Sequence, residues 1–164
     1  MKIDIKIGIG FDVHSFAEGR KLVLGGIEIP SPKGLEGHSD ADVLLHAISD
    51  AILGALALGD IGKHFPNTDP KWKDVDSSVI LKHCYEIVKS KGFIISNIDS
   101  MLALESPKIS PYIQQMQNRI ADILQVSPSQ ISIKATTTEK LGFVGRSEGA
   151  VAMATVLLIK SELP

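Results

Sequence analysis

The sequence contains little cysteine, no long apolar run and no block of basic residues. Cys84 is the only cysteine in 164 residues, which excludes an internal disulfide and a cysteine-rich zinc knuckle and fits a reducing compartment. Residues 1–10 alternate between apolar and polar, a pattern that neither a signal peptide nor a membrane-spanning segment has. The net charge is only −2, with no basic patch for nucleic acid. We therefore expect a cytoplasmic protein, or a plastid-type organellar one freed of its transit peptide, with neither a nucleic-acid nor a membrane partner.

The glycine-rich motifs of common nucleotide-binding folds are also absent. The sequence has no GxxxxGK[ST] and no GxGxxG that opens a helix, so any phosphate must be bound by other local groups. Hydrophobic residues make up 44% and charged residues 22%, which excludes a disordered or collagen-like chain. A chain of this length buries roughly 70% of its unfolded surface. We expect residues 1–164 to form one domain.

The hydrophobic pattern predicts strands and helices in alternation. Apolar residues at every second position predict the first strand, and Gly25-Gly26 between two short apolar segments predicts a hairpin. Ser39 and Asp42 resemble a capping box at the start of a helix. The segment 60–76 is rich in Gly, Pro, Asp and Asn, which is typical of a functional loop. The predicted strands cover 3–11, 22–24, 27–29, 97–104, 131–136 and 150–159, and the predicted helices cover 39–59, 76–92 and 110–125.

The order of these elements is ββααβαββ when the hairpin is counted as one unit, and this order predicts the fold class. We expect an α+β protein, a single-domain α/β sandwich of ferredoxin-like arrangement, with helices packed on one face of a mainly four-stranded sheet. The second helix should turn inward the apolar residues Val79, Ile80, Cys84, Ile87 and Val88. Cys84 should therefore contribute to packing rather than to chemistry.

One Asp and two His form a candidate metal site. Asp12 and His14, two residues apart at the end of the first strand, leave the same face of that strand, opposite to the isoleucines. His46 lies on the polar side of the first helix. One carboxylate and two imidazoles suit zinc with a fourth position left open. Segment 34–62 has five acidic residues and no Lys or Arg, so a cation would offset its charge. The alternative is that these are ordinary turn and surface residues.

A second candidate site binds phosphate. Three threonines, Thr136 to Thr138, precede Glu139 and Lys140, and a glycine-containing segment with Arg146 follows. Hydroxyls, backbone amides and basic side chains bind phosphate, while a nearby carboxylate can hold a magnesium-like ion against it. The alternative is an ordinary β-strand, in which three threonines are also favoured.

Several motifs in order along the chain carry a family resemblance from Ile7 to about Ala152. They are Asp12-Val13-His14, His38-Ser39-Asp40-Ala41-Asp42 with His46, the segment 57–62, Phe65-Pro66, and the segment 134–143. Together they resemble the 2-C-methyl-D-erythritol 2,4-cyclodiphosphate synthase family. The resemblance implies a metal-dependent lyase of non-mevalonate isoprenoid biosynthesis. It would convert 4-diphosphocytidyl-2-C-methyl-D-erythritol 2-phosphate into the cyclic diphosphate and CMP.

The resemblance also implies roles for individual residues. Zn²⁺ is expected at Asp12, His14 and His46, a second ion, Mg²⁺ or Mn²⁺, at Glu139, and transition-state stabilisation from His38 and Thr137. Asn67 departs from the family, which has Asp there, and this puts rate or affinity in doubt but spares the metal ligands. The substrate contacts map onto Asp12, Val13, His14, His38, Ser39, Asp60, Ile61, Gly62, Phe65, Pro66, Asn67, Thr68, Asp69, Leu104, Glu105, Ser106, Pro107, Lys108, Ile109, Ser110, Thr136, Thr137, Thr138, Glu139, Phe143 and Arg146.

Family members are homotrimers with sites between subunits, so the resemblance implies a homotrimer here. Arg146 and Glu148 match residues near the threefold axis, where they would bind an anion such as an isoprenoid diphosphate or pair with each other. Two other functions stay open: a trimeric module that holds zinc structurally, and a regulatory protein that senses isoprenoid diphosphates through Arg146. A structural zinc normally has four protein ligands, whereas this motif supplies three.

Overall fold

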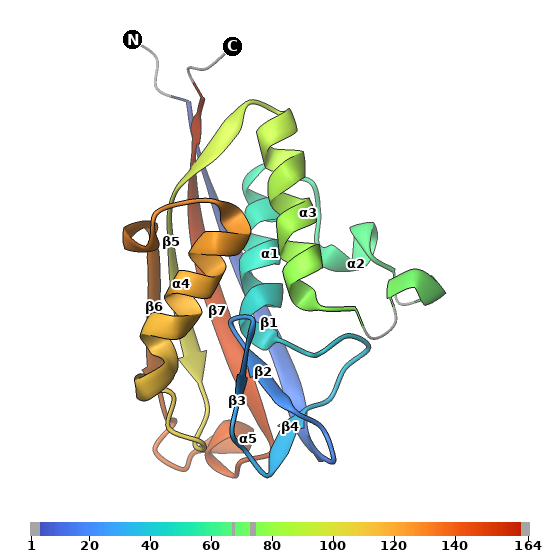
Figure 1. Ribbon diagram of the computed structural model, residues 1–164, viewed down its shortest axis with the longest axis vertical. Coiled ribbons are helices and arrows are strands. Elements are labelled where there is room, and N and C mark those ends of the chain that lie inside the picture. The colour runs from blue at the N-terminus through green and yellow to red at the C-terminus, as the bar shows by residue number, and fades with distance from the viewer. Residues whose placement is uncertain (1–3, 67, 73–74, 162–164) are drawn as a thin grey trace.

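The computed structural model describes residues 4–66, 68–72 and 75–161 (Figure 1). Its main sheet has five strands in the order β4-β1-β7-β5-β6, and β2 and β3 form a separate two-stranded sheet. Neighbouring strands of the main sheet are antiparallel except β5 and β6, which are parallel. The strands are β1 Ile5–Glu18, β2 Leu22–Leu24, β3 Ile27–Ile29, β4 Lys33–Leu35, β5 Phe93–Ala103, β6 Ile131–Thr136 and β7 Gly149–Lys160.

The helices cover one face of the main sheet, as the sequence predicts (Figure 1). The helix α1 lies against β1 and β7, α3 packs on α1, and α4 lies beside β6. Their inward side chains form one continuous hydrophobic core with the inner face of the sheet. The helices are α1 Val43–Ala55, α2 Ile61–His64, α3 Ser77–Ser90, α4 Ile113–Leu124 and α5 Gly142–Gly145, with 3₁₀ turns at Pro70–Trp72, Ser110–Tyr112 and Pro128–Gln130.

Two glycines of β1 allow α1 to approach the sheet closely. A Cβ atom on Gly8 would lie 1.8 Å from the carbonyl oxygen of Ala51, and one on Gly10 would lie 1.9 Å from that of Ala47. No side chain fits at such distances, so only glycine permits this contact. The close approach matters for function because β1 carries the predicted metal ligands Asp12 and His14, and α1 carries the third, His46.

The opposite face of β1 is exposed. Ile7 and Ile9 are each 67% exposed and Phe11 is 57% exposed, although large apolar side chains are usually buried in a folded protein. Alternation along the strand places these residues opposite to Asp12 and His14, as predicted. The full set of exposed large apolar residues on β1 and its neighbour β7 is Ile5, Ile7, Ile9, Phe11, Val13 and Met153. A contiguous apolar surface of this kind marks an interaction face.

The expected four-stranded ferredoxin-like sheet needs correction. The short strand β4 adds a fifth member beside β1, and the predicted hairpin at 22–29 forms but stays outside the main sheet. The start of the first helix also differs, because α1 begins at Val43 and its N-cap is Asp42, not Ser39. The reason is the fully buried Asp42 carboxylate, which accepts hydrogen bonds from the backbone N–H groups of Leu44 and Leu45.

The other predicted elements form with the expected type, but β1 continues to Glu18 and β5 already begins at Phe93, and one residue expected to point inward does not. The helix α3 covers Ser77–Ser90, within the expected range 76–92; Asp76 is its N-cap, and its residue Cys84 is buried. Burial raises the pKa of the Cys84 thiol to about 12, which fits packing rather than chemistry. Val79 was expected to point inward but is 49% exposed, because it precedes the buried pair Ile80 and Leu81 on the flank of the helix. Among the described helices, none is long and apolar enough to cross a membrane. The cytoplasmic location stays a prediction.

Candidate metal centre and substrate pockets

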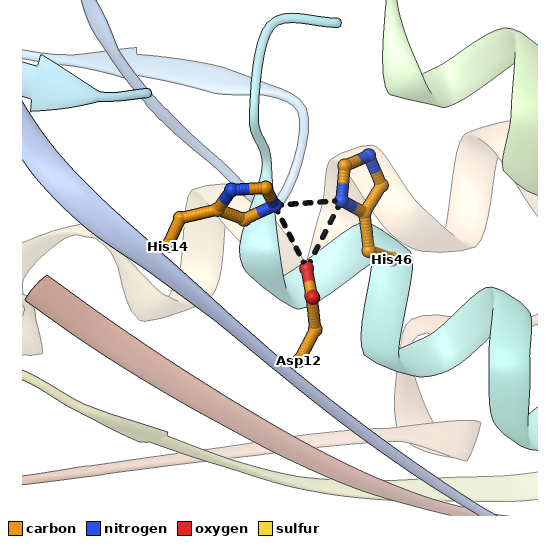
Figure 2. A group of neighbouring side chains, drawn as sticks. All are labelled: Asp12, His14 and His46. Carbon is orange, nitrogen blue, oxygen red and sulfur yellow. Dashed lines mark hydrogen bonds and ion pairs between the residues drawn. The ribbon is translucent and has the colours of Figure 1, made fainter. Parts of the chain in front are cut away.

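The three predicted zinc ligands meet at one point between β1 and α1. Asp12 and His14 project from the same face of β1, and His46 projects from the first turn of α1 toward them (Figure 2). Asp12 Oδ2 lies 3.0 Å from His14 Nε2 and 3.0 Å from His46 Nδ1. The two imidazole nitrogens are 3.2 Å apart. Of the residues that the structure describes, these three form the group arranged to hold a metal ion.

The outer nitrogen of each histidine also has a partner. His14 Nδ1 lies 2.7 Å from the carbonyl oxygen of Glu36. A carbonyl only accepts hydrogen bonds, so Nδ1 carries a proton; when the ring is neutral its lone pair lies on Nε2, the nitrogen that faces Asp12. His46 Nε2 faces the hydroxyl of Ser77 at 2.9 Å. Such partners orient imidazole ligands at metal sites and fix their tautomer.

The electrostatics of the group suit a cation. Burial alone would raise the pKa of Asp12, but hydrogen bonds and charge interactions with His14 and His46 hold it at about 2. For His14, burial lowers the pKa, yet the Asp12 carboxylate outweighs this and raises it above its ordinary value. The side chains therefore already stabilise positive charge beside Asp12. A divalent cation would supply that charge and displace the proton of His14.

The donor geometry fits zinc. Tetrahedral zinc with bonds of about 2.0–2.1 Å has its ligand atoms about 3.3–3.4 Å apart. The observed separations of 3.0 to 3.2 Å are close to this value. Three protein ligands leave a fourth position, which is the arrangement of catalytic rather than structural zinc.

A pocket of about 200 Å³ lies beside the three ligands. The short helix α2 forms part of its wall and is positioned by two carboxylates. Asp60 caps it by accepting from the N–H of Lys63 at 3.0 Å, and Asp50 of α1 accepts from the N–H of Ile61 at 2.8 Å. The predicted site residues that line this pocket are Asp12, His14, His38, Ser39, His46, Ile61, Gly62 and Phe65.

A second pocket, of about 190 Å³, lies between the end of β5 and the end of β6. Glu105 fixes its threonine segment, because its Oε1 accepts from the backbone N–H of Thr138 at 2.9 Å. The sheet order places β7 between β1 and β5, so this pocket and the metal group belong to different parts of one chain. The predicted site residues that line it are Leu104, Glu105, Pro107, Lys108, Ile109, Ser110, Thr136 and Thr137.

The remaining predicted residues line neither pocket. Glu139 lies near Thr137, whose hydroxyl donates to its Oε1 at 3.2 Å, but no cluster of acidic or His groups forms around it in the described part of the chain. Asn67 lies outside the described residues. The predicted substrate contacts outside the two pockets are Val13, Asp60, Pro66, Thr68, Asp69, Ser106, Thr138, Glu139, Phe143 and Arg146.

Of the two roles open to Arg146 and Glu148, the structure shows the mutual ion pair. The guanidinium donates from Nε at 2.9 Å and from its second amino group at 3.0 Å to the two carboxylate oxygens. This bidentate geometry is the strong form of such a pair, although both groups are exposed. An isoprenoid diphosphate at Arg146 stays a prediction.

Sequence reasoning missed several residues of the two pockets. Trp72 and Ile80 line the first and Ala135 lines the second. Trp72 lies in the segment 60–76, whose composition is typical of a functional loop, so its position in the sequence could have predicted it as a site residue. Ile80 and Ala135 lie inside a helix and a strand, where a pocket-lining residue has the same pattern as a core residue. The serine behind His46, Ser77, also had no signal, because it is distant in sequence.

Comparisons with known proteins find relatives that match nearly the whole chain. A family model described as the YgbB family matches residues 5–159. A protein of Lysinibacillus sphaericus named 2-C-methyl-D-erythritol 2,4-cyclodiphosphate synthase is 60% identical over 155 residues, which are 94% of this chain and 98% of that protein.

Two solved structures are similar throughout this chain. Bifunctional IspDF from Campylobacter jejuni is 47% identical, with a TM-score of 0.93 over 97% of this chain, which spans 43% of that longer protein. IspF of Plasmodium falciparum in a CDP complex is 34% identical, with a TM-score of 0.86, and the match covers 99% of this chain and 100% of that one. With a family match over residues 5–159 and a relative 60% identical over nearly its whole length, the chain belongs to the YgbB family.

Proposed function

We propose that the chain converts 4-diphosphocytidyl-2-C-methyl-D-erythritol 2-phosphate into 2-C-methyl-D-erythritol 2,4-cyclodiphosphate and CMP. Relatives about 60% identical over nearly full length carry the name of this synthase, whose reaction belongs to the non-mevalonate pathway. The single observation that carries the proposal is the three-ligand group of Asp12, His14 and His46 beside an open pocket. The reaction belongs to the lyases, because the substrate closes on itself and no water or acceptor enters.

The chemistry requires position and positive charge more than a strong base. The 2-phosphate of the substrate attacks its own β-phosphorus, a new P–O bond forms, and the bond to CMP breaks, so CMP leaves with the electron pair. The attacking phosphate is already ionised at neutral pH, so no group needs to remove a proton from it. Two phosphate groups repel each other unless a site neutralises and aligns them.

The first pocket is the proposed site of phosphate alignment. When bound to Asp12, His14 and His46, Zn²⁺ would polarise the β-phosphate and offset the charge that develops on it. His38 lines the same pocket, and we assign it to contact the developing charge. The apolar residue Phe65 forms part of the wall and would help fold the erythritol chain toward ring closure.

The second pocket is the proposed nucleotide site. Lys108 and Thr136 line it and would contact the cytidine diphosphate, and Thr137 would stabilise the transition state. Glu139 is assigned to hold Mg²⁺ or Mn²⁺, which would offset charge on the leaving CMP. The hydrogen bond from Thr137 to Glu139 supports this assignment because it places both groups at one loop.

A homotrimer would complete the site. An exposed apolar face such as that of β1 and β7 is usually buried against a partner, and further copies of this chain would bury it. The metal group and the second pocket, separated by β7 within one chain, would then meet across each interface. We propose that residues 1–164 act as one cyclodiphosphate synthase domain whose active sites lie between subunits.

Complementation tests the shared site. One variant, His46→Ala, lacks the zinc half, and another, Thr137→Ala with Glu139→Ala, lacks the nucleotide half. Neither homotrimer should turn over. After mixed refolding at equal ratio, about one site in four combines two intact halves, and activity should return to about that fraction of the parent's. A mixed trimer without any activity would contradict the shared site and leave the metal assignment untouched.

The reaction itself is tested by following both products. Purified chain incubated with the diphosphocytidyl substrate should release CMP, and ³¹P NMR should show a cyclic diphosphate in equal amount. The matched control is the His46→Ala variant under the same conditions. Release of CMP together with an open-chain diphosphate would indicate hydrolysis and contradict the cyclisation. Binding of substrate without turnover would support a sensor instead.

A further inference from the structure

A chain of hydrogen bonds leads from the metal group into the protein behind it. His46 Nε2 lies 2.9 Å from Ser77 Oγ, and Ser77 Oγ lies 2.5 Å from Asp40 Oδ1. His46 and Ser77 are buried, Ser77 completely so. Ser77 is the first residue of α3, while Asp40 lies in the loop before α1, so the contacts join three separate segments.

The chemistry of these groups fixes the direction of each hydrogen bond. The Asp40 carboxylate only accepts, so the Ser77 hydroxyl donates its proton to it. The oxygen of Ser77 then accepts, and its donor is the Nε2–H of His46. With its proton on Nε2, the neutral imidazole presents a lone pair at Nδ1, which is the atom directed at Asp12 and His14.

The backbone holds Asp40 in place for this role. Its second oxygen accepts from the backbone N–H of Ser77 at 3.1 Å, and its own N–H donates to the carbonyl of Val75 at 3.3 Å. The hydroxyl of Ser39 also faces His46 Nε2, but at 3.2 Å, and it already accepts from the N–H of Ala41. Ser77 therefore makes the shorter contact with His46 Nε2, and it is the serine whose hydroxyl is polarised by a carboxylate, that of Asp40.

The geometry points to Ser77 and Asp40 as positioning residues of the metal centre, which hold His46 in the tautomer and ring orientation that bind zinc through Nδ1. The inference rests on the proposed function, because it presumes that His46 is a metal ligand. Partners of this kind typically change metal affinity by about 10- to 100-fold when removed. Neither residue contacts the pocket in which we place the reacting phosphates.

The first test measures zinc affinity by competition with a chelator, without substrate. Ser77→Ala should raise the zinc Kd by about tenfold or more. The matched control is Ser49→Ala, because Ser49 is an equally buried serine of α1 whose hydroxyl donates to the Leu45 carbonyl at 2.8 Å and not to His46. Its zinc Kd should stay within about twofold of the parent's, while a Kd for Ser77→Ala equal to the control's would overturn the inference.

A second variant keeps the test decisive if Ser77→Ala fails to fold. Asp40→Asn preserves volume but removes the negative charge that polarises Ser77, so its zinc Kd should also rise, by less than that of Ser77→Ala. In zinc-loaded protein with ¹⁵N-labelled histidine, the Nε2–H proton of His46 should resonate in the strongly hydrogen-bonded range. In the variants this resonance should move upfield, a change that a general loss of stability does not cause.

The two proposals fail in different ways. A parent chain that takes up no divalent metal would contradict the metal site and the positioning role together. A parent that binds zinc, with both variants binding equally well and an unmoved Nε2–H resonance, would refute the positioning role alone and leave the proposed function standing.

Discussion

Replacing Gly10 with alanine would disturb both stability and metal binding through one contact. The added Cβ would lie 1.9 Å from the Ala47 carbonyl oxygen and 2.8 Å from the Ala51 N–H nitrogen. Both atoms belong to the backbone of α1, so no side-chain rotation relieves the clash. Ordinary contact begins near 3.4 Å, and α1 would therefore have to move away from β1 by about 1.5 Å.

This displacement sets the size of the effect. Overpacking a core typically costs about 1–3 kcal/mol. We expect Gly10→Ala to lower the free energy of unfolding by about 3 kcal/mol, the upper end of this range, because the backbone of α1 must shift. The same movement separates His46 on α1 from Asp12 on β1, now in contact at 3.0 Å. A ligand set opened by more than about 1 Å departs from zinc geometry, so zinc affinity should fall by at least about tenfold.

Urea denaturation and zinc competition measure the two effects on the same protein. Gly54→Ala is the matched control, because a Cβ there meets only the Ile9 carbonyl oxygen, at 3.7 Å. Gly54 lies in α1, where alanine is a better helix former by about 1 kcal/mol, so this variant should be unchanged or more stable. If Gly10→Ala unfolds at the same urea concentration as the parent and binds zinc equally well, the close approach of α1 to β1 is needed neither for stability nor for metal binding.

Three further predictions concern other groups. Since the effect of Asp12 outweighs burial and raises the pKa of His14, the metal-free protein keeps the His14 proton to a higher pH. Zinc affinity should therefore fall as the pH drops through this pKa, because zinc must displace the proton. A zinc affinity, measured by calorimetry, that does not change between about pH 6 and 8 would contradict this. Asp42→Ala should lower the free energy of unfolding by about 3 kcal/mol, because it leaves buried N–H groups without an acceptor, including those of the β2–β3 turn. Asp76→Ala removes an exposed helix cap and should lower it by only about 1 kcal/mol. Equal losses for the two variants in urea unfolding would contradict this difference. Glu139→Gln should keep zinc but weaken the dependence of turnover on Mg²⁺ or Mn²⁺, and an unchanged magnesium titration would remove Glu139 from that role.

The sequence pattern predicted the elements better than their packing. Alternation from Ile5 to Phe11 identified β1, and the glycine pair at 25–26 identified the hairpin. Periodicity alone could not show that the glycine face of β1 packs on α1, because that depends on how near a helix can come. The hairpin stays outside the main sheet for a similar reason. Asp42 accepts from Gly25 and Gly26 at 3.0 and 2.7 Å and ties the turn to α1, a contact between residues far apart in sequence.

For the site, residue types and strand period predicted the metal group, and the structure brings its three members together. Asp12 and His14 share a face because a strand has a period of two, and this is readable from sequence. The partner of His46 was not readable, since Ser77 follows a loop of irregular structure and gains its role only through the fold. Roles assigned by resemblance alone, such as those of Glu139 and Phe143, remain predictions because neither residue lines the first or the second pocket described above.

Turnover is expected to depend on a metal held by Asp12, His14 and His46. This dependence can be measured as the rate of CMP release from the diphosphocytidyl substrate, in excess Mg²⁺, after zinc has been removed with a chelator and then restored. The metal-free parent should lose nearly all activity and regain it with about one zinc per chain. His46→Ala should stay folded and inactive at the same zinc concentration. Release of CMP at the full rate by the zinc-free parent would show that turnover does not need a metal at these three residues.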